Sequence, residues 1–391
     1  MLQDFLDLCV RIDFMVNLDS PEEIDSQGLK AAVLSSSLRI KKLDTKGVST
    51  SIELLGKQCQ QVWEEVSELG LPREFADCRN IVVCGMGGST LGTHVIHSLY
   101  FDQLKTPLEI VNGYHLPSYV DKNSLVVLSS YSGTTEEVLA CFEEAKKRDT
   151  KILAISSGGN LGKLVKEGKA AGYVFEPKYN PSGQPRMGLG YSILGQILIF
   201  SKLGFLAFSE SDFSKVLSAV EKINSQSKSD VDTSQNQAKQ IALEFKDKIP
   251  FLFASEHLVG NIHVFANQIN ENAKSLSCYF ALPEANHHLT EGLSSPEGTH
   301  DKTIFFLLKS SLYSERVLKR YEITKNIVGE NGIKTAVFEP QSQTKLEQVF
   351  EFLTFGSWVS FYLAMVYGRD PSPIPNVDSL KSAMATASPG T

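Results

Sequence analysis

The chain has 391 residues, of which 42% are hydrophobic and 21% are charged, and this composition is typical of a soluble globular protein rather than a disordered one. One core rarely organises so many residues, so we expect two domains of comparable size and a terminal extension. The formal net charge of −7 argues against nucleic acid or an anionic membrane as a partner, so a phosphorylated ligand must be held by local groups.

Cysteine usage and the first residues bear on the compartment. The six cysteines form no C-x-x-C pair and no cluster with histidine at zinc-ligand spacing, which is typical of a reducing compartment and predicts no metal site. The opening MLQDFLDLCV lacks the basic segment of an export signal, so we expect a cytoplasmic protein. The apolar stretch ILGQILIFSKLGFLAF is too short and too interrupted for a membrane span and is predicted as a buried helix.

The first half of the chain alternates between expected helices and strands. Residues 1–48 show no clear period and are predicted as an N-terminal helical extension. Residues 49–222 form the first predicted domain, which opens on a helix at 49–69. Its strands are expected at 80–84, 108–112, 124–129, 151–156 and 173–176. Because these strands are apolar without interruption, we expect a parallel sheet covered by helices on both faces.

A second α/β unit follows the polar segment 223–240, which is predicted as a linker or helix. The second predicted domain, 241–391, has strands expected at 250–254, 302–308 and 334–339. Its helices are expected at 259–276, 315–331 and 344–367, with a short one near 377–385. In parallel sheets, ligands bind at the carboxyl ends of the strands, so the loops there are the candidate sites.

Two loops of this kind are suited to an anion. GMGGST, residues 85–90, and SYSGTT, residues 130–135, each lie between a strand and a helix N-terminus, where free backbone N–H groups attract a phosphate. The second loop adds several hydroxyl donors without adding charge. The alternative for part of it is a capping box formed by Thr134 and Glu137.

A dinucleotide site is the other interpretation of the first loop. Gly85 and Gly87 match two positions of G-x-G-x-x-G, but Thr90 stands at the third and the next strand ends in Asn112 rather than an acid. Both mismatches disfavour NAD. The Gly-Lys-Ser/Thr of a Walker loop is absent from the sequence.

Candidate catalytic groups are densest in NQINENAKSLSCYFALPEANHH, residues 267–288. At about 100° per residue, Glu271 lies roughly 200° from Ile269 of the apolar stripe, so the pattern favours a solvated glutamate paired with Lys274. His287 follows in a loop, where histidines are more often surface groups than catalysts. Arg186 in PSGQPR is, by pattern, the surface arginine of a proline-rich turn.

The ordered set GMGGST, YHLPSYV, SYSGTTEE, PSGQPR, NQINENAK and PEANHH resembles the bifunctional phosphoglucose/phosphomannose isomerases of the sugar isomerase (SIS) superfamily, from about Gln58 to Lys381. The resemblance implies an α/β fold of two SIS subdomains, each a mostly parallel sheet flanked by helices. It also implies a homodimer with active sites shared between subunits, a phosphorylated hexose substrate and no cofactor or metal. The implied reaction interconverts glucose 6-phosphate and/or mannose 6-phosphate with fructose 6-phosphate.

The resemblance also assigns roles to single residues. It makes Glu271 the base that moves a proton between C2 and C1, His287 the ring-opening group and Arg186 the stabiliser of the intermediate. Lys381 resembles the family's active-site lysine. The residues implied to bind the sugar phosphate or to line its cleft are Ser130, Ser132, Thr135, Gly87, Gly88 and Ser89. One base and one cation suit an enediolate intermediate, which needs a proton acceptor and a charge near the oxyanion.

The chain departs from the family pattern beside the implied ring-opening group. His288 and Leu289 stand where Asn and Glu are usual, and Leu293 replaces a customary Trp, which leaves the sugar preference open. The stretch before Ser49 is longer than the family needs, and its role is open.

Two related functions compete with the isomerase. A non-catalytic SIS sensor of sugar phosphates needs no base or ring opener, so the joint presence of Glu271, His287 and Arg186 disfavours it. The isomerase half of a glutamine-dependent aminotransferase needs an N-terminal cysteine, and this chain starts with Met1 and Leu2.

Overall fold

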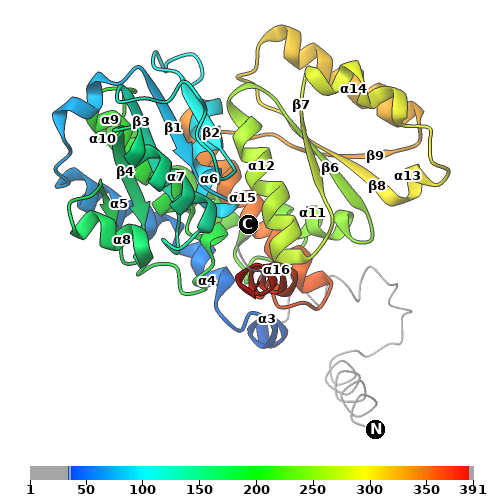
Figure 1. The fold of residues 1–391 in the computed structure, drawn as a ribbon. Coiled ribbons are helices and arrows are strands. Elements are labelled where there is room, and N and C mark those ends of the chain that lie inside the picture. Colours follow the sequence, from blue (N-terminus) through cyan, green and yellow to red (C-terminus); the bar gives the residue numbers. More distant parts are fainter. Residues whose placement is uncertain (1–33, 35–36, 387–391) are drawn as a thin grey trace.

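Two parallel β-sheets organise the chain, one in each half of the molecule (Figure 1). The computed structural model describes residue 34 and residues 37–386, so most of the predicted extension 1–48 lies outside the described residues. The first sheet has the order β2-β1-β3-β4-β5, with β1 Asn80–Cys84, β2 Leu108–Val111, β3 Ser124–Ser129, β4 Lys151–Ser156 and β5 Ala171–Val174. All its neighbouring strands pair in parallel. The five predicted strands are confirmed, with shifts of up to two residues at their ends.

The first sheet is buried on both faces, which explains its uninterrupted apolar strands. Val83 and Val127 belong to a large core shared by both halves, whereas Val82 and Val126 belong to a smaller core on the opposite face. The helices of this half are α4 Val48–Glu53, α5 Leu55–Ser67, α6 Gly88–Leu99, α7 Glu136–Lys147, α8 Gly159–Lys166, α9 Gly195–Lys202 and α10 Glu210–Ser227. α7 and α8 cover the smaller core, and α5 and α6 contribute to the large one.

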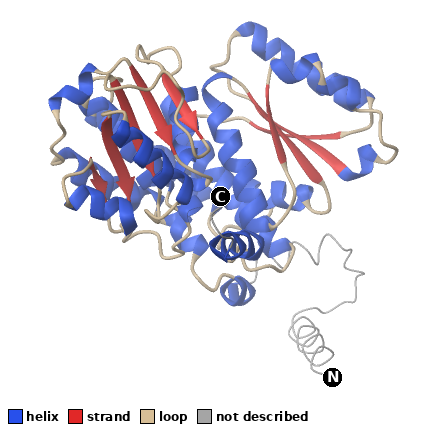
Figure 2. Ribbon diagram, viewed as in Figure 1, coloured by secondary structure: helices blue, strands red, loops and turns tan. Residues whose placement is uncertain are grey.

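The second sheet has four parallel strands in the order β7-β6-β8-β9 (Figure 2). The strands are β6 Ile249–Ala254, β7 Cys278–Ala281, β8 Thr303–Leu308 and β9 Lys334–Phe338. β7 was not predicted, because it is a short edge strand whose residues are half-buried or exposed and therefore lack an apolar run. The other three strands and the α/β class with two helix-flanked sheets are confirmed.

A single apolar helix, α15 Lys345–Val366, lies at the centre of the molecule and packs against helices of both halves. By length and composition it is the one described helix that could cross a membrane, but 94% of its most apolar window is buried within the protein. Its Trp358 indole donates to Asn224 Oδ1 of α10 at 2.9 Å. α15 is therefore a buried core helix, and it joins the two halves.

The remaining helices complete the second half and the ends of the chain. They are α3 Ser37–Leu43, α11 Gln237–Phe245, α12 Val259–Gln268, α13 Thr299–Lys302, α14 Glu315–Glu330 and α16 Pro375–Thr386. Short 3₁₀ or π turns are η1 Arg73–Asp77, η2 Pro185–Met187, η3 Gly190–Leu194, η4 Glu256–Leu258, η5 Ile269–Ala273, η6 Glu284–His287 and η7 Leu289–Gly292. Within the polar segment 223–240, α10 continues to Ser227 and α11 begins at Gln237. The domain boundaries themselves stay a prediction.

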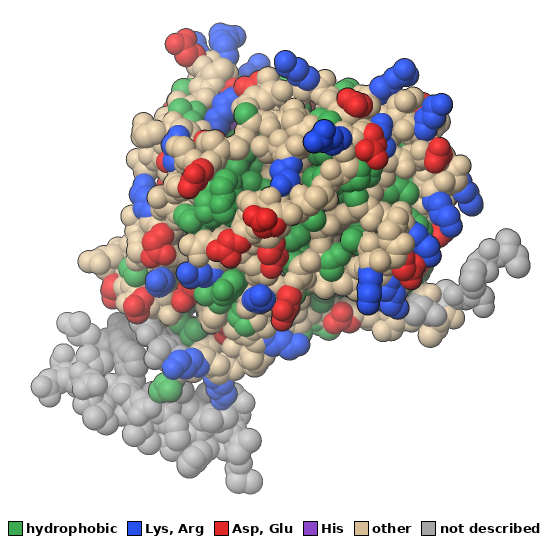
Figure 3. All heavy atoms as spheres, turned by 90° about the vertical axis from the view of Figure 1, so that its left-hand side faces the viewer, with side chains coloured by type: hydrophobic (Ala, Val, Ile, Leu, Met, Phe, Trp, Pro, Cys, Tyr) green, Lys and Arg blue, Asp and Glu red, His purple; other side chains and the backbone are tan. Residues whose placement is uncertain are grey.

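The surface on the side of the first sheet carries interspersed charges. In Figure 3, acidic and basic side chains alternate over this face between small apolar areas. This distribution agrees with the net charge of −7 and gives a phosphate no broad basic attraction on this face.

Candidate active site

The carboxyl end of β3 forms a hydroxyl-rich loop, residues 130–135. Ser130 is fully buried, its Oγ lies 2.7 Å from Thr135 Oγ1, and it accepts the Gly133 N–H at 3.0 Å. Ser132 is exposed and leaves its hydroxyl accessible to a ligand. The loop thus has a rigid inner hydroxyl and an accessible outer one.

The N-terminus of α7 behind this loop is open. Thr135 is the N-cap residue, and no side chain of a described residue caps the helix. The alternative capping box of Thr134 and Glu137 is therefore wrong. The first-turn N–H groups of a helix have no partner within the helix, so those of α7 are placed to donate hydrogen bonds to an anion.

Glycine is required where this loop touches the next one. A Cβ on Gly133, whose φ is +69°, would lie 1.9 Å from the Gly158 carbonyl oxygen. A Cβ on Gly159, at φ +61°, would lie 2.3 Å from the Ser132 carbonyl oxygen. The loop SSGG, residues 156–159, therefore supports the hydroxyl loop. This loop was not predicted, although paired glycines directly after a strand indicate such a turn.

The loop after β1, residues 85–90, is fastened to the hydroxyl loop. Ser89 Oγ accepts the Tyr131 N–H at 2.9 Å, and Ser129 Oγ donates to the Ser89 carbonyl at 2.6 Å. Asn112, which disfavoured a dinucleotide site in the sequence, donates from Nδ2 to the Gly85 carbonyl at 2.7 Å and so holds the loop. The two predicted anion loops therefore form one unit.

Gly88 brings the segment of Arg186 against this unit. A Cβ on Gly88 would lie 3.0 Å from the Arg186 backbone nitrogen and 3.1 Å from the Pro185 carbonyl carbon. The exposed Gly87 precedes it with φ +49° and faces open space. That the two glycines line a substrate cleft stays a prediction.

Arg186 is buried, with 1% of its side chain exposed, and is not the surface arginine that its turn suggested. Nε donates to Asn272 Oδ1 at 2.5 Å, while Nη1 donates to Gln184 Oε1 at 2.8 Å and to Glu271 Oε2 at 3.1 Å. Burial lowers the pKa of Arg186 and the Glu271 carboxylate opposes that shift, so the guanidinium stays charged. A buried, fully bonded cation thus faces the predicted base.

The far side of the guanidinium is bound by the chain near the C-terminus. Arg186 Nη2 donates to the carbonyl oxygens of Pro371 and Ser372, both at 2.8 Å. Each of its five N–H directions therefore has a protein acceptor, which fixes the plane of the group.

Glu271 lies on the π-helical segment η5, where α12 widens before it ends. A π segment turns only slightly less per residue than an α-helix, so Glu271 still lies nearly opposite the buried Ile269. The predicted pairing with Lys274 is wrong, because Arg186 from another segment bonds the carboxylate on that side. Its Oε2 bonds Arg186, whereas Oε1 has no partner among the described residues, and 27% of the side chain is exposed. One carboxylate oxygen is therefore fixed and the other is free to take a proton.

Two residues that the sequence analysis did not single out hold this arrangement. Asn272 is fully buried and donates from Nδ2 to Ser360 Oγ of α15 at 3.0 Å, while its Oδ1 accepts from Arg186. Gln268 donates to the Arg186 carbonyl at 3.2 Å and to Ser357 Oγ of α15 at 2.9 Å. The core helix thereby supports the base and the cation from behind.

In the described residues, His287 and Lys381 form no hydrogen bond or ion pair with Glu271 or Arg186. His287 ends η6, after the edge strand β7, and is exposed. Lys381 is exposed on α16. Within the described part of the chain, neither side chain has a hydrogen-bond or ion-pair partner.

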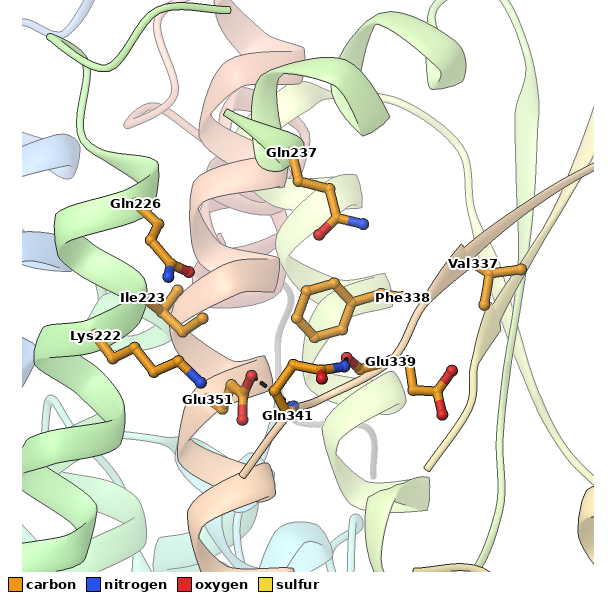
Figure 4. A pocket seen from close by; sticks show the side chains of 9 residues that line it. All are labelled: Lys222, Ile223, Gln226, Gln237, Val337, Phe338, Glu339, Gln341 and Glu351. Carbon is orange, nitrogen blue, oxygen red and sulfur yellow. Dashed lines mark hydrogen bonds between the residues drawn. The ribbon is translucent and has the colours of Figure 1, made fainter. Parts of the chain in front are cut away.

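Two hollows in the described part of the chain differ in whether predicted site residues line them. A small one under the joined loops is lined by Gly88, Ser89, Ser129, Tyr131, Ile155, Phe175, Pro185 and Ser192. A more open pocket of about 380 Å³ lies between α10, α11, β9 and α15 (Figure 4), and no predicted site residue lines it. Its Glu351 carboxylate accepts the N–H groups of Gln341 and Ser342, both at 2.9 Å, and so holds the loop after β9.

Comparisons with known proteins agree with the two-sheet organisation. A family model described as the bacterial phospho-glucose isomerase C-terminal SIS domain matches residues 234–384, and an SIS domain model matches residues 74–170. A solved structure of a hypothetical protein from Thermus thermophilus superposes with a TM-score of 0.73 at 15% identity, covering 93% of this chain and 96% of that one. This likeness concerns the fold.

Sequence relatives extend over both halves. A bifunctional phosphoglucose/phosphomannose isomerase from Caldicellulosiruptor bescii is 31% identical over 343 residues, which are 86% of this chain and 98% of the relative. A protein of the same name from Aquifex aeolicus is 30% identical over 324 residues, covering 82% and 94%. This chain therefore belongs to the family of bifunctional phosphoglucose/phosphomannose isomerases.

Proposed function

We propose that the protein is an aldose–ketose isomerase that interconverts fructose 6-phosphate with glucose 6-phosphate and/or mannose 6-phosphate. Family membership supports the reaction class. The observation that carries the proposal is the Glu271 carboxylate, with one oxygen open and the other fixed by the buried Arg186, whose segment packs against Gly88 of the anion loops.

The chemistry needs few groups. On the open-chain sugar, Glu271 takes the proton from C1 of the ketose, and the electrons of that C–H bond form the C1=C2 bond of the enediolate while the C2 carbonyl becomes an oxyanion. A proton then moves from O1 to O2, the C1 carbonyl forms, and the Glu271 carboxylic acid delivers a proton to C2. Delivery to either face of C2 gives the glucose or the mannose epimer. A positioned carboxylate contributes about 10²–10⁴-fold to such a step.

The phosphate and the developing charge are held by separate parts of the site. Ser130, Ser132 and Thr135, with the α7 amides, bind the phosphate, and Gly87, Gly88 and Ser89 line the cleft. Arg186 stabilises the enediolate through the field of a buried charge, which is stronger than in water. This division leaves no step that requires a metal, and activity should survive EDTA.

His287 opens the sugar ring, and it and Lys381 act in a homodimer whose sites are shared between subunits. Their exposure in the single chain supports this role. Glu271→Gln and His287→Ala, each inactive alone, should regain about a quarter of wild-type activity when mixed and allowed to exchange subunits, because half the dimers then carry one intact site. No recovery despite proven exchange would contradict shared sites. We propose the cytoplasm as the compartment.

The deciding experiment supplies the wild-type protein with fructose 6-phosphate and follows glucose 6-phosphate and mannose 6-phosphate by coupled assays, with and without EDTA. Formation of at least one aldose in both conditions is expected. Binding of these sugars without turnover would instead identify a sensor.

A further inference from the structure

Lys274 ends the π-helical segment that carries Glu271, and its side chain joins that segment to the chain before α16. Its backbone is left-handed, at φ 52° and ψ 39°. The half-buried ammonium donates to the Asn272 carbonyl at 3.1 Å and to the Asp370 carbonyl at 2.6 Å. Lys274 is therefore a structural contact between the segment of the base and a distant part of the chain.

The segment that Lys274 holds is also the one that Arg186 holds. We call residues 369–372 the clasp. Lys274 binds the carbonyl of Asp370, and Arg186 binds the next two carbonyls, of Pro371 and Ser372. In return, Arg369 Nη1 donates to the Lys274 carbonyl at 2.8 Å. Two buried or half-buried cations thus bind three consecutive carbonyls.

The clasp fixes how the arginine faces the base. A guanidinium is planar, so the positions of the two carbonyls at Nη2 determine where Nη1 points. Nη1 is the nitrogen that bonds Glu271 Oε2. Movement of the clasp would therefore rotate the cation away from the carboxylate, and it would also displace α16, which follows the clasp and carries Lys381.

We propose that Lys274 is a positioning residue of the isomerase: it holds the clasp so that Arg186 stays oriented on Glu271. This inference rests on the proposed function. Both hydrogen bonds of the Lys274 ammonium go to protein carbonyls, so Lys274 need not touch the sugar. Its loss should affect turnover more than substrate binding, because the anion loops lie elsewhere.

The charge of Lys274 is set by its surroundings. The charged groups around it are Arg186, Arg369, Glu271 and Asp370, and burial with the two arginines outweighs the two carboxylates. Together they lower the pKa of Lys274 from 10.5 to about 8. The ammonium therefore predominates below pH 8 and is lost as the pH rises through 8. Because charge-assisted hydrogen bonds are about twice as strong as neutral ones, the clasp weakens in that window.

The test compares Lys274→Met with Lys274→Arg, which keeps its charge at all accessible pH values. In the methionine variant we expect kcat to fall about tenfold or more, as for a small misplacement of catalytic groups, with KM within about threefold. The arginine variant should recover most of kcat at pH 7.5. It should also lack the alkaline decline near pH 8 that we expect of the wild type.

Several outcomes would overturn the inference. One is an unchanged kcat in Lys274→Met. Another is a kcat of Lys274→Arg that still declines near pH 8. Lys309→Met is the control, because Lys309 bonds Glu322 at 2.9 Å at the second sheet, far along the chain from the clasp. If the methionine variant does not fold, the pH profile of the arginine variant alone decides.

Hydrogen exchange tests the clasp without relying on activity. The Ser372 N–H donates to Asp370 Oδ1 at 2.8 Å, and its protection reports the shape of the clasp. Lys274→Met should speed exchange in the peptide containing residues 369–372, and Lys309→Met should not. Unchanged exchange would refute the inference, whereas a wild type that exchanges as expected but turns over no hexose phosphate would refute only the proposed function.

Discussion

The two sheets end in loops of the same topology but opposite character. At the first sheet, the loops after β1 and β3 contain Gly87 and Gly133 at positive φ and leave helix amides and hydroxyls open. At the second, the loop after β8 is KSSLYS, with no glycine, and its Tyr313 is buried. One end is built to receive a ligand and the other is filled by the protein.

The hydroxyl of Tyr313 pairs with backbone groups at the strand ends, where a ligand would otherwise bind. The Tyr313 hydroxyl accepts the Ser255 N–H at the end of β6, at 3.1 Å, and donates to the Leu308 carbonyl at 3.1 Å. Tyr321 donates to the same carbonyl at 3.0 Å. Parallel-sheet topology alone therefore does not make a phosphate site, and glycine at the loop decides whether the strand end stays open.

The largest expected effect on catalysis is that of replacing Glu271, the proposed base. Glu271→Gln keeps the size of the side chain but removes the proton acceptor, so kcat for fructose 6-phosphate should fall about 10²–10⁴-fold. The coupled assay measures it. Glu322→Gln, which alters a largely exposed glutamate of α14, is the control. A Glu271→Gln variant within tenfold of the wild type would remove Glu271 from its role.

Arg186→Met should cost the most stability. The substitution removes the hydrogen-bond donors of the Pro371 and Ser372 carbonyls and leaves Glu271 without its partner. We expect the free energy of unfolding to fall by about 3–5 kcal/mol, the usual cost of breaking a buried ion pair. Urea denaturation measures it against Lys169→Met, which removes an exposed ion pair and should change little. A loss as small as the control's would contradict the burial argument.

Gly133→Ala tests the first sheet's open loop. The added Cβ would meet the Gly158 carbonyl at 1.9 Å in a left-handed backbone, so the loop must move. We expect KM for fructose 6-phosphate to rise about tenfold, equivalent to the 1–3 kcal/mol of such strain. Gly70→Ala, whose Cβ would meet nothing within 4 Å, is the matched control. Equal KM values in the two variants would show that the loop does not bind the substrate.

Tyr313→Phe tests the second sheet's closed loop and should have the smallest effect on catalysis. Removing the hydroxyl leaves the Ser255 N–H unpaired in the core, which costs about 1–3 kcal/mol of stability. KM should stay unchanged. Tyr367→Phe, whose hydroxyl bond to Asp247 is exposed, is the control for denaturation. A rise in KM would mean that the second sheet also contributes to binding.

Continuous apolar runs made most of the fold predictable. A strand buried on both faces carries few polar residues except at its ends, so β1, β3, β4 and β8 stand out in the sequence. β7 was not predicted, because an edge strand needs only one apolar side. The capping box at Thr134 failed because the helix begins one residue later than its pattern indicates.

The site was predictable in its motifs but not in its contacts. The pattern of α12 placed Glu271 in solvent, because local periodicity does not show that Arg186, from a distant segment, bonds the carboxylate. Likewise, nothing near Arg186 in the sequence indicates that its ligands come from Asn272 and the clasp, which lie 86 and 185–186 residues away. The roles of His287 and Lys381 depend on a partner subunit and stay predictions.

The most direct measurement follows the proton itself. Incubating fructose 6-phosphate with the protein in D₂O and reading the aldose by NMR reports deuterium at C2, because a carboxylic acid exchanges with solvent before returning its proton. We predict that the wild type labels C2 and that Glu271→Gln labels it at least a hundred times more slowly. Labelling by Glu271→Gln at the wild-type rate would contradict the assignment of Glu271 as the base.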